Sequence, residues 1–189
     1  HLKFVGAIAL ATTLLFTGCA TSGTSAQAQA TATKPSDAVA SLIAKHKLEV
    51  VDFKYARSKL GSGMRGATDA LFIDARPDRH YNAGTIPSSI QIHDADFKDH
   101  IKRIDKTPKD KEIIVFCQGW DCAKSPKVAA MLKEIGYTNV KLYQAGYPEW
   151  SKKDYIEIST AVVKNAFDGN TALLIDARPY AKFLAESIP

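Results

Sequence analysis

Two cysteines five residues apart, Cys117 and Cys122, carry the clearest chemical signal in this 189-residue chain. Cys117 follows an apolar run, and Cys122 stands just before a segment with helical spacing, where Lys124 adds a positive charge. The thiolate is the reactive form of cysteine, and a helix N-terminus or a nearby cation lowers a thiol pKa. The sequence therefore predicts a nucleophilic Cys117 whose sulfur is open to water. The alternative that stays open is a small buried side chain at a strand end.

The residues around the two cysteines are suited to an anion or to a second sulfur atom. The unpaired N–H groups and positive dipole end of a helix N-terminus bind negative charge, and Gly119 lets the backbone curl. The predicted substrate-binding residues are Gln118, Gly119, Trp120, Asp121, Ala123 and Lys124. Two cysteines without a histidine in the loop supply too few metal ligands, so no metal site is expected there. His93 and His100 are expected on the surface of a connecting segment.

The elements that must position this loop alternate between strand and helix. Apolar runs without alternation are typical of strands covered on both faces of a parallel sheet. A helix is predicted after the loop, with Ser125 as N-cap, Pro126 at the first helical position and Gly136 as its stop. The fold class is therefore α/β, a parallel sheet flanked by helices on both faces. The predicted strands lie at 71–73, 113–116 and, more weakly, 140–143.

The chain contains an internal repeat at an offset of 102 residues. The segment LFIDARP at 71–77 returns as LLIDARP at 173–179, and Ile-Pro at 86–87 returns at 188–189. An echo of this length in register predicts a duplicated unit. The predicted parts are a signal peptide at 1–18, a tether at 19–36, a first domain at 37–155 and the start of a truncated second domain at 156–189.

The N-terminal residues resemble a bacterial lipoprotein signal. One lysine and a short apolar run precede Cys19, and a stretch rich in Ala, Ser and Thr follows it. Such a run is shorter than the apolar segment that a membrane-spanning helix needs. The resemblance implies that Cys19 is a lipid anchor to a membrane of the cell envelope, facing the periplasm or the outside, and on the outer membrane in a Gram-negative cell. That compartment permits disulfides. A buried apolar helix with an ordinary thiol is the alternative.

Charge excludes one class of partner. The formal net charge of +5 comes from lysines and arginines spread along the chain, with no block of five or six like charges. A nucleic-acid-binding protein concentrates such charge in a patch or stripe. No nucleic-acid partner is therefore expected.

Five segments in a fixed order make the first domain resemble a rhodanese. In this family the strand at 113–116 delivers a catalytic cysteine, here Cys117. The resemblance implies a sulfurtransferase in which Cys117 takes sulfane sulfur from thiosulfate or a persulfide donor. Cys117 passes this sulfur to cyanide or to a thiol, and a protein thiol is among the acceptors considered. The resemblance implies no cofactor, because the nucleophile is itself the carrier. The matching segments are FIDAR at 72–76, YNAGTIP at 81–87, IVFC at 114–117, GYTNV at 136–140 and LYQAGYPEW at 142–150.

The sequence departs from the family pattern at Thr85, Ser88 and Ala145, but the departures in the loop are more informative. Cys122 stands where the family commonly has arginine, and Ala123 stands where phosphatase relatives of the fold clamp phosphate with arginine. Phosphate-ester hydrolysis is therefore disfavoured. Asp121 opposes a second negative charge, so thiosulfate is expected to bind weakly, and a persulfide or a protein is then the expected donor.

Several alternatives stay open at this stage. If the loop curls as in the family, Cys122 could attack a persulfide or sulfenate on Cys117, or be a static disulfide partner; pairing needs Cα atoms within about 7 Å. A dithiol redox protein, a protein handling selenium or tellurium oxyanions, and a non-catalytic binding module are the other functions considered. Asp74 and Arg76 could orient substrate, but a structural salt bridge is the expected role.

Overall fold

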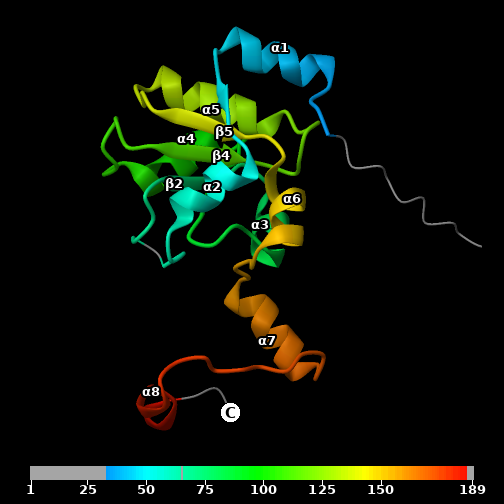
Figure 1. Cartoon of the computed structure of the whole chain (residues 1–189), viewed down its shortest axis with the longest axis vertical. Coiled ribbons are helices and arrows are strands. Elements are labelled where there is room, and N and C mark those ends of the chain that lie inside the picture. Colours follow the sequence, from blue (N-terminus) through cyan, green and yellow to red (C-terminus); the bar gives the residue numbers. More distant parts are fainter. Residues whose placement is uncertain (1–32, 65, 187–189) are drawn as a thin grey trace, which may run out of the picture. The chain divides into compact units, whose positions relative to one another are not determined.

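The computed structural model describes residues 33–64 and 66–186 (Figure 1). The signal segment at 1–18 and Cys19 lie outside the described residues, so the lipid anchor stays a prediction. Among the residues that are described, no helix combines the length and the apolar character that a membrane span requires.

A five-stranded parallel sheet in the order β1-β5-β4-β2-β3 forms the centre of the domain. The three apolar runs of the sequence become β2, β4 and β5, and the strand with the longest apolar run, β4, lies between the other two. The α/β prediction is thereby confirmed. The strands span Glu49–Val50 (β1), Leu71–Asp74 (β2), Ile90–Gln91 (β3), Ile113–Phe116 (β4) and Val140–Tyr143 (β5).

Helices cover both faces of this sheet (Figure 1). Ile113 and Val115 of β4 pack with α1, α4, η1 and α5, while Ile114 and Phe116 pack with α2 and α6. Successive strand residues point to opposite faces, so an unbroken apolar run supplies both cores. The helices span Asp37–Lys45 (α1), Phe53–Leu60 (α2), Asp78–Ala83 (α3), Phe97–His100 (α4), Ile101–Ile104 (η1), Lys124–Glu134 (α5), Gly146–Lys153 (α6), Thr160–Asp168 (α7) and Tyr180–Ala185 (α8).

Helix α5 begins two residues earlier than the sequence predicts. Ala123 is its N-cap and Lys124 its first residue, so the expected N-cap Ser125 lies inside the helix. The Ser125 hydroxyl donates to Gln144 Oε1 at 3.2 Å instead of capping. Pro126 is tolerated in the first turn because the N–H groups there have no partner within the helix. The end is as predicted, since Gly136 follows the C-cap with a φ of +97°.

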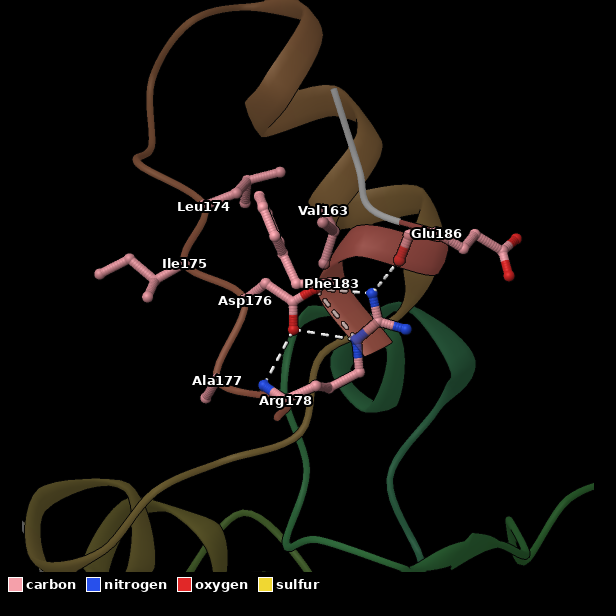
Figure 2. Close-up of a pocket in the computed structure, with 8 residues that line it drawn as sticks. All are labelled: Val163, Leu174, Ile175, Asp176, Ala177, Arg178, Phe183 and Glu186. Atoms are coloured by element: carbon pink, nitrogen blue, oxygen red, sulfur yellow. Dashed lines mark hydrogen bonds and ion pairs between the residues drawn. The ribbon is translucent and has the colours of Figure 1, made fainter. Parts of the chain in front are cut away.

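The second copy of the repeat reproduces the local structure of the first without its strand. Helix α8 lies 102 residues after α3. Arg178 Nη2 lies 2.6 Å from Asp176 Oδ2, and Arg76 Nη2 lies at the same distance from Asp74 Oδ2. This ion pair lines a cavity of about 620 Å³, and Figure 2 shows the residues around it. Residues 173–176 form no strand in the described chain, and Leu173 is 86% exposed. In the first copy β2 is held by β3 and β4, so a repeated sequence without neighbouring strands keeps only its local contacts.

Candidate active site

The loop with the two cysteines lies at the carboxyl edge of the central strand. Cys117 directly follows β4, and Lys124 opens α5. Strand β4 pairs with β2 on one side and β5 on the other, so the residues that follow these strands converge on the loop. Ligands of open parallel sheets bind at this edge.

Cys117 and Cys122 form a disulfide, with their Cα atoms 6.2 Å apart. Cys117 is only 1% exposed, whereas Cys122 is half-buried. The expectation of a sulfur open to water is therefore wrong for this oxidised state, because Cys122 is bonded to the sulfur that a substrate must reach. The open question of pairing is answered: the loop brings the two sulfurs together.

The residues after β5 contact the backbone of Cys117. The backbone N–H of Tyr147 donates to the carbonyl of Cys117 at 2.9 Å. Gly146, just before it, has a φ of +62°, and a Cβ built there would lie 2.2 Å from Cys117 O. Only glycine combines this left-handed backbone with so close an approach.

The side chain of Gln144 binds the backbone of the loop. The sequence did not point to Gln144 as a functional residue. Its buried side-chain amide donates from Nε2 to Trp120 O at 2.8 Å, Cys122 O at 3.0 Å and Gly119 O at 3.3 Å. These carbonyls consequently turn toward Gln144. In the part of the chain that the structure describes, the N–H groups of Trp120 and Asp121 have no protein acceptor. A polar residue directly after an apolar strand was the signal that could have found Gln144.

The Asp74–Arg76 pair joins the end of β2 to the loop. Both side chains are buried, and Thr85 also donates to Asp74 Oδ2 at 2.8 Å. Arg76 Nη1 donates to Gln118 Oε1 at 3.3 Å, and its guanidinium carbon lies 4.0 Å from the Tyr147 ring centroid. This arrangement fits the expected structural role, since a buried guanidinium with all these contacts has little freedom to follow a substrate.

Lys124 is already paired with an acid that the sequence analysis did not single out. Its Nζ lies 3.0 Å from Asp94 Oδ1, and Lys127 Nζ lies 3.9 Å from Asp94 Oδ2. Burial raises the pKa of Asp94, but the hydrogen bond and charge of Lys124 outweigh it, so the pKa ends below its usual value. The cation expected to attract substrate is thus already paired with a carboxylate.

His93 is not a surface residue as expected. Its side chain is 13% exposed, and Nε2 lies 3.3 Å from Asp94 Oδ1 without a hydrogen bond. Its backbone N–H donates to His100 Nδ1 at 3.2 Å. Within the described residues no group of three or more His, Cys, Asp or Glu side chains could hold a metal ion.

The structure gathers all the predicted loop residues around the disulfide, in different degrees of exposure. Gln118 and Asp121 are exposed, Trp120 and Ala123 are half-buried, and Gly119 is buried. The backbone N–H of a tether residue, Ser36, donates to Asp121 Oδ1 at 3.0 Å. Their roles as substrate contacts stay predictions.

Comparison with known proteins gives a family and a fold. The family model of the rhodanese-like domain matches residues 58–153, just over half of the chain. An "HTH-type transcriptional regulator Rv0324" from Mycobacterium tuberculosis is 31% identical over 86 residues, which are 46% of this chain and 36% of the relative. A "tRNA uridine(34) hydroxylase" from Pelagibacter ubique is 31% identical over 84 residues, which are 44% of this chain and 27% of the relative. The chain thus spans only about a third of the length of these relatives.

Two solved structures share the fold. The BH2092 protein of Bacillus halodurans has a TM-score of 0.51 at 24% identity, over 65% of this chain and 85% of that one. A thiosulfate sulfurtransferase from Pseudomonas aeruginosa has a TM-score of 0.50 at 15% identity, over 65% of this chain and 22% of that one. With the sheet order, the cysteine after β4 and the family match in agreement, the chain belongs to the rhodanese-like domain family.

Proposed function

We propose that the reduced protein is a sulfurtransferase that carries sulfane sulfur on Cys117. Membership of the rhodanese-like family supports a sulfurtransferase-type activity. The observation that carries the proposal is the place of Cys117, between the end of β4 and the first turn of α5. A thiolate there faces a helix N-terminus, which stabilises the charged form. The loop amides without protein acceptors support binding of a negatively charged sulfur atom beside it.

The proposed reaction has two displacement steps. The Cys117 thiolate attacks the outer sulfur of thiosulfate or of a persulfide, and a Cys117–S–S⁻ persulfide forms while sulfite or a thiolate leaves with the bonding electron pair. A nucleophilic acceptor, cyanide or a thiol, then attacks the terminal sulfur and releases the Cys117 thiolate. No cofactor takes part, because the cysteine is both nucleophile and carrier.

The disulfide must be reduced before the first step. A sulfur bonded to Cys122 is no nucleophile, and Cys117 is almost fully buried. An external thiol has better access to half-buried Cys122, and attack there would release the Cys117 thiolate. The proposal therefore includes a thiol reductant among the partners of the protein.

The charges around the loop favour a persulfide donor over thiosulfate. Asp121 is exposed in the loop itself, and Lys124 is paired with Asp94. Thiosulfate carries two negative charges, so its binding is weakened more than that of a singly charged persulfide beside Asp121 and a lysine that is already paired. The physiological acceptor is proposed to be a thiol, on a small molecule or on a protein.

Mass spectrometry of the reduced protein tests the proposal. The reduced Cys122→Ser variant, which cannot close the disulfide, is incubated briefly with thiosulfate and its thiols are trapped; we expect a peptide with Cys117 that is heavier by about 32 Da, one sulfur atom. The oxidised protein and Cys117→Ser should show no such peptide. Thiocyanate formation from cyanide should be lost in Cys117→Ser. A reduced protein that forms neither adduct nor thiocyanate with any donor would instead support the non-catalytic binding module.

Replacing Asp94 with asparagine is expected to improve the use of thiosulfate. The substitution removes one carboxylate and frees Lys124, so the KM for thiosulfate should fall about three- to tenfold, which corresponds to roughly 1 kcal/mol. The gain should shrink at high salt, because the charges are partly exposed. The KM for a singly charged persulfide should change less. Asp99→Asn, which removes an exposed partner of Lys102, is the control and should leave both KM values unchanged. Equal KM values for wild type and Asp94→Asn would refute the charge argument.

The disulfide favours a second candidate function, thiol–disulfide exchange. Two cysteines that pair within one loop can accept two electrons from a dithiol without any sulfane sulfur. A dithiol protein of this kind would reduce a disulfide or chalcogen oxyanion with equal need for Cys117 and Cys122. In the sulfurtransferase, thiocyanate formation needs Cys117 alone, so Cys122→Ser separates the two functions.

We also propose a location at a membrane of the cell envelope. The support is in the sequence: a short apolar run before Cys19, followed by a tether of small polar residues. Acylation of Cys19 would leave the first domain free to meet its donor on the outer face of that membrane.

A further inference from the structure

In the structure the sulfurs of Cys122 and Cys117 are bonded while the hydrogen bonds that brace the loop are in place. In the disulfide, Gln144 still holds the carbonyl of Cys122, and Tyr147 still holds the carbonyl of Cys117. The backbone N–H of Cys122 also donates to Gly119 O at 3.0 Å, so the second cysteine stands in a closed turn. The disulfide is therefore compatible with the backbone contacts that brace the loop.

We infer that Cys122 resolves the persulfide on Cys117 and releases the transferred sulfur as hydrosulfide. This inference rests on the proposed function, because it needs the Cys117 persulfide as its starting point. It adds a second activity to the same loop: reductive release of sulfide, with the two cysteines as the source of electrons.

The step balances with the groups that the loop holds. The Cys122 thiol first gives its proton to the outer sulfur of Cys117–S–S⁻, which yields Cys117–S–SH and a Cys122 thiolate. The thiolate attacks Sγ of Cys117, a bond forms between the two cysteine sulfurs, and the bond to the outer sulfur breaks. The outer sulfur leaves as HS⁻ with the electron pair and its proton, so one negative charge stands on each side. The sulfane sulfur gains two electrons, and the two cysteines lose two as they become the disulfide.

Position decides which sulfur Cys122 attacks. In the structure Cys122 is bonded to Sγ of Cys117, the inner sulfur of the persulfide, and Cys117 is buried beneath the loop. An external nucleophile such as cyanide takes the outer sulfur and yields thiocyanate, whereas Cys122 reaches the inner one and yields sulfide. The product therefore reports which nucleophile acted.

Cys122 also has a large advantage in concentration. Two groups in one short loop meet at an effective concentration of about a millimolar or more, and good alignment raises this further. A thiol acceptor at micromolar concentration would lose to Cys122 by about three orders of magnitude at equal reactivity. Sulfide release is thus the expected default fate of the persulfide, and each further turnover needs an external thiol to reduce the disulfide.

A single-turnover experiment tests the inference on the whole chain. Protein reduced and freed of reductant under anaerobic conditions receives thiosulfate, and sulfide, sulfite, free thiols and peptide masses are measured. The wild type should release about one sulfide and one sulfite per chain and lose two thiols, ending with a Cys117–Cys122 disulfide. Cys122→Ser should release sulfite without sulfide and keep the adduct of about 32 Da on Cys117. Peptide mapping separates these cysteines from Cys19.

The other outcomes separate failure of the inference from failure of the proposed function. If wild type and Cys122→Ser both keep the adduct and neither releases sulfide, Cys122 is a static partner and the inference is wrong, while the sulfurtransferase stands. If neither forms an adduct, sulfite or thiocyanate, the proposed function fails and the inference falls with it. Cyanide added with the donor should yield several-fold more thiocyanate from Cys122→Ser than from the wild type in one turnover; equal yields would also overturn the inference.

Discussion

Asp74→Ala is expected to lower the free energy of unfolding by about 3–5 kcal/mol, because it leaves a buried guanidinium without its counter-charge. Arg76 is 2% exposed, and Asp74 accepts from its Nη2 at 2.6 Å and from its backbone N–H at 2.9 Å. Since a domain of this kind is stabilised by about 5–15 kcal/mol in total, the variant should lie near the limit of folding. Urea unfolding measures this loss: the midpoint should fall, while the dependence of the unfolding free energy on urea concentration stays unchanged.

The internal repeat offers a matched control for this variant. Asp176→Ala removes the equivalent carboxylate from the ion pair of the second copy, where the Arg178 side chain is 50% exposed, against 2% for Arg76. Water can solvate the guanidinium that is left there, so the urea midpoint should not move measurably. Similar effects of the two substitutions would contradict the idea that burial makes the first pair important.

Gly146→Ala is expected to reduce sulfurtransferase activity about 100-fold or more while the fold persists. The added Cβ would lie 2.2 Å from Cys117 O and 3.1 Å from Gly119 N, so the backbone of the catalytic loop has to move. A displacement of about 1 Å at a reacting group is enough for a loss of this size. The left-handed φ of +62° adds about 1–2 kcal/mol of strain for a residue with a side chain. Thiocyanate formation by the reduced protein measures the loss.

Gly136→Ala separates backbone strain from displacement of the loop. Gly136 also has a positive φ, +97°, but nothing lies within 4 Å of a Cβ built there. It follows α5, at the end away from Cys117, so it should lose a similar amount of stability and keep its activity. If Gly136→Ala loses as much activity as Gly146→Ala, strain alone explains both, and the close approach to Cys117 is irrelevant.

Much of the site had to await the structure because it is made by contacts between distant elements. Gln144 reaches the carbonyls of a loop more than twenty residues earlier, and Asp94, in a connecting segment, pairs with Lys124. Gln144 lies within the LYQAGYPEW segment, but the segment does not show that its side chain satisfies buried carbonyls, and Asp94 belongs to no local pattern. The same reason made His93 look like a surface residue.

The sequence by itself determined the α/β class, the strands with two buried faces, the end of α5 at Gly136 and the place of Cys117 after β4. These features depend on apolar periodicity and on residues with special backbone preferences, which are readable over a few positions. Only the tertiary structure decided that Cys117 is bonded to Cys122, that Lys124 is already paired with a carboxylate and that the second LLIDARP segment forms no strand. Each of these depends on which groups meet across the fold, and on whether neighbouring strands are present to complete a sheet.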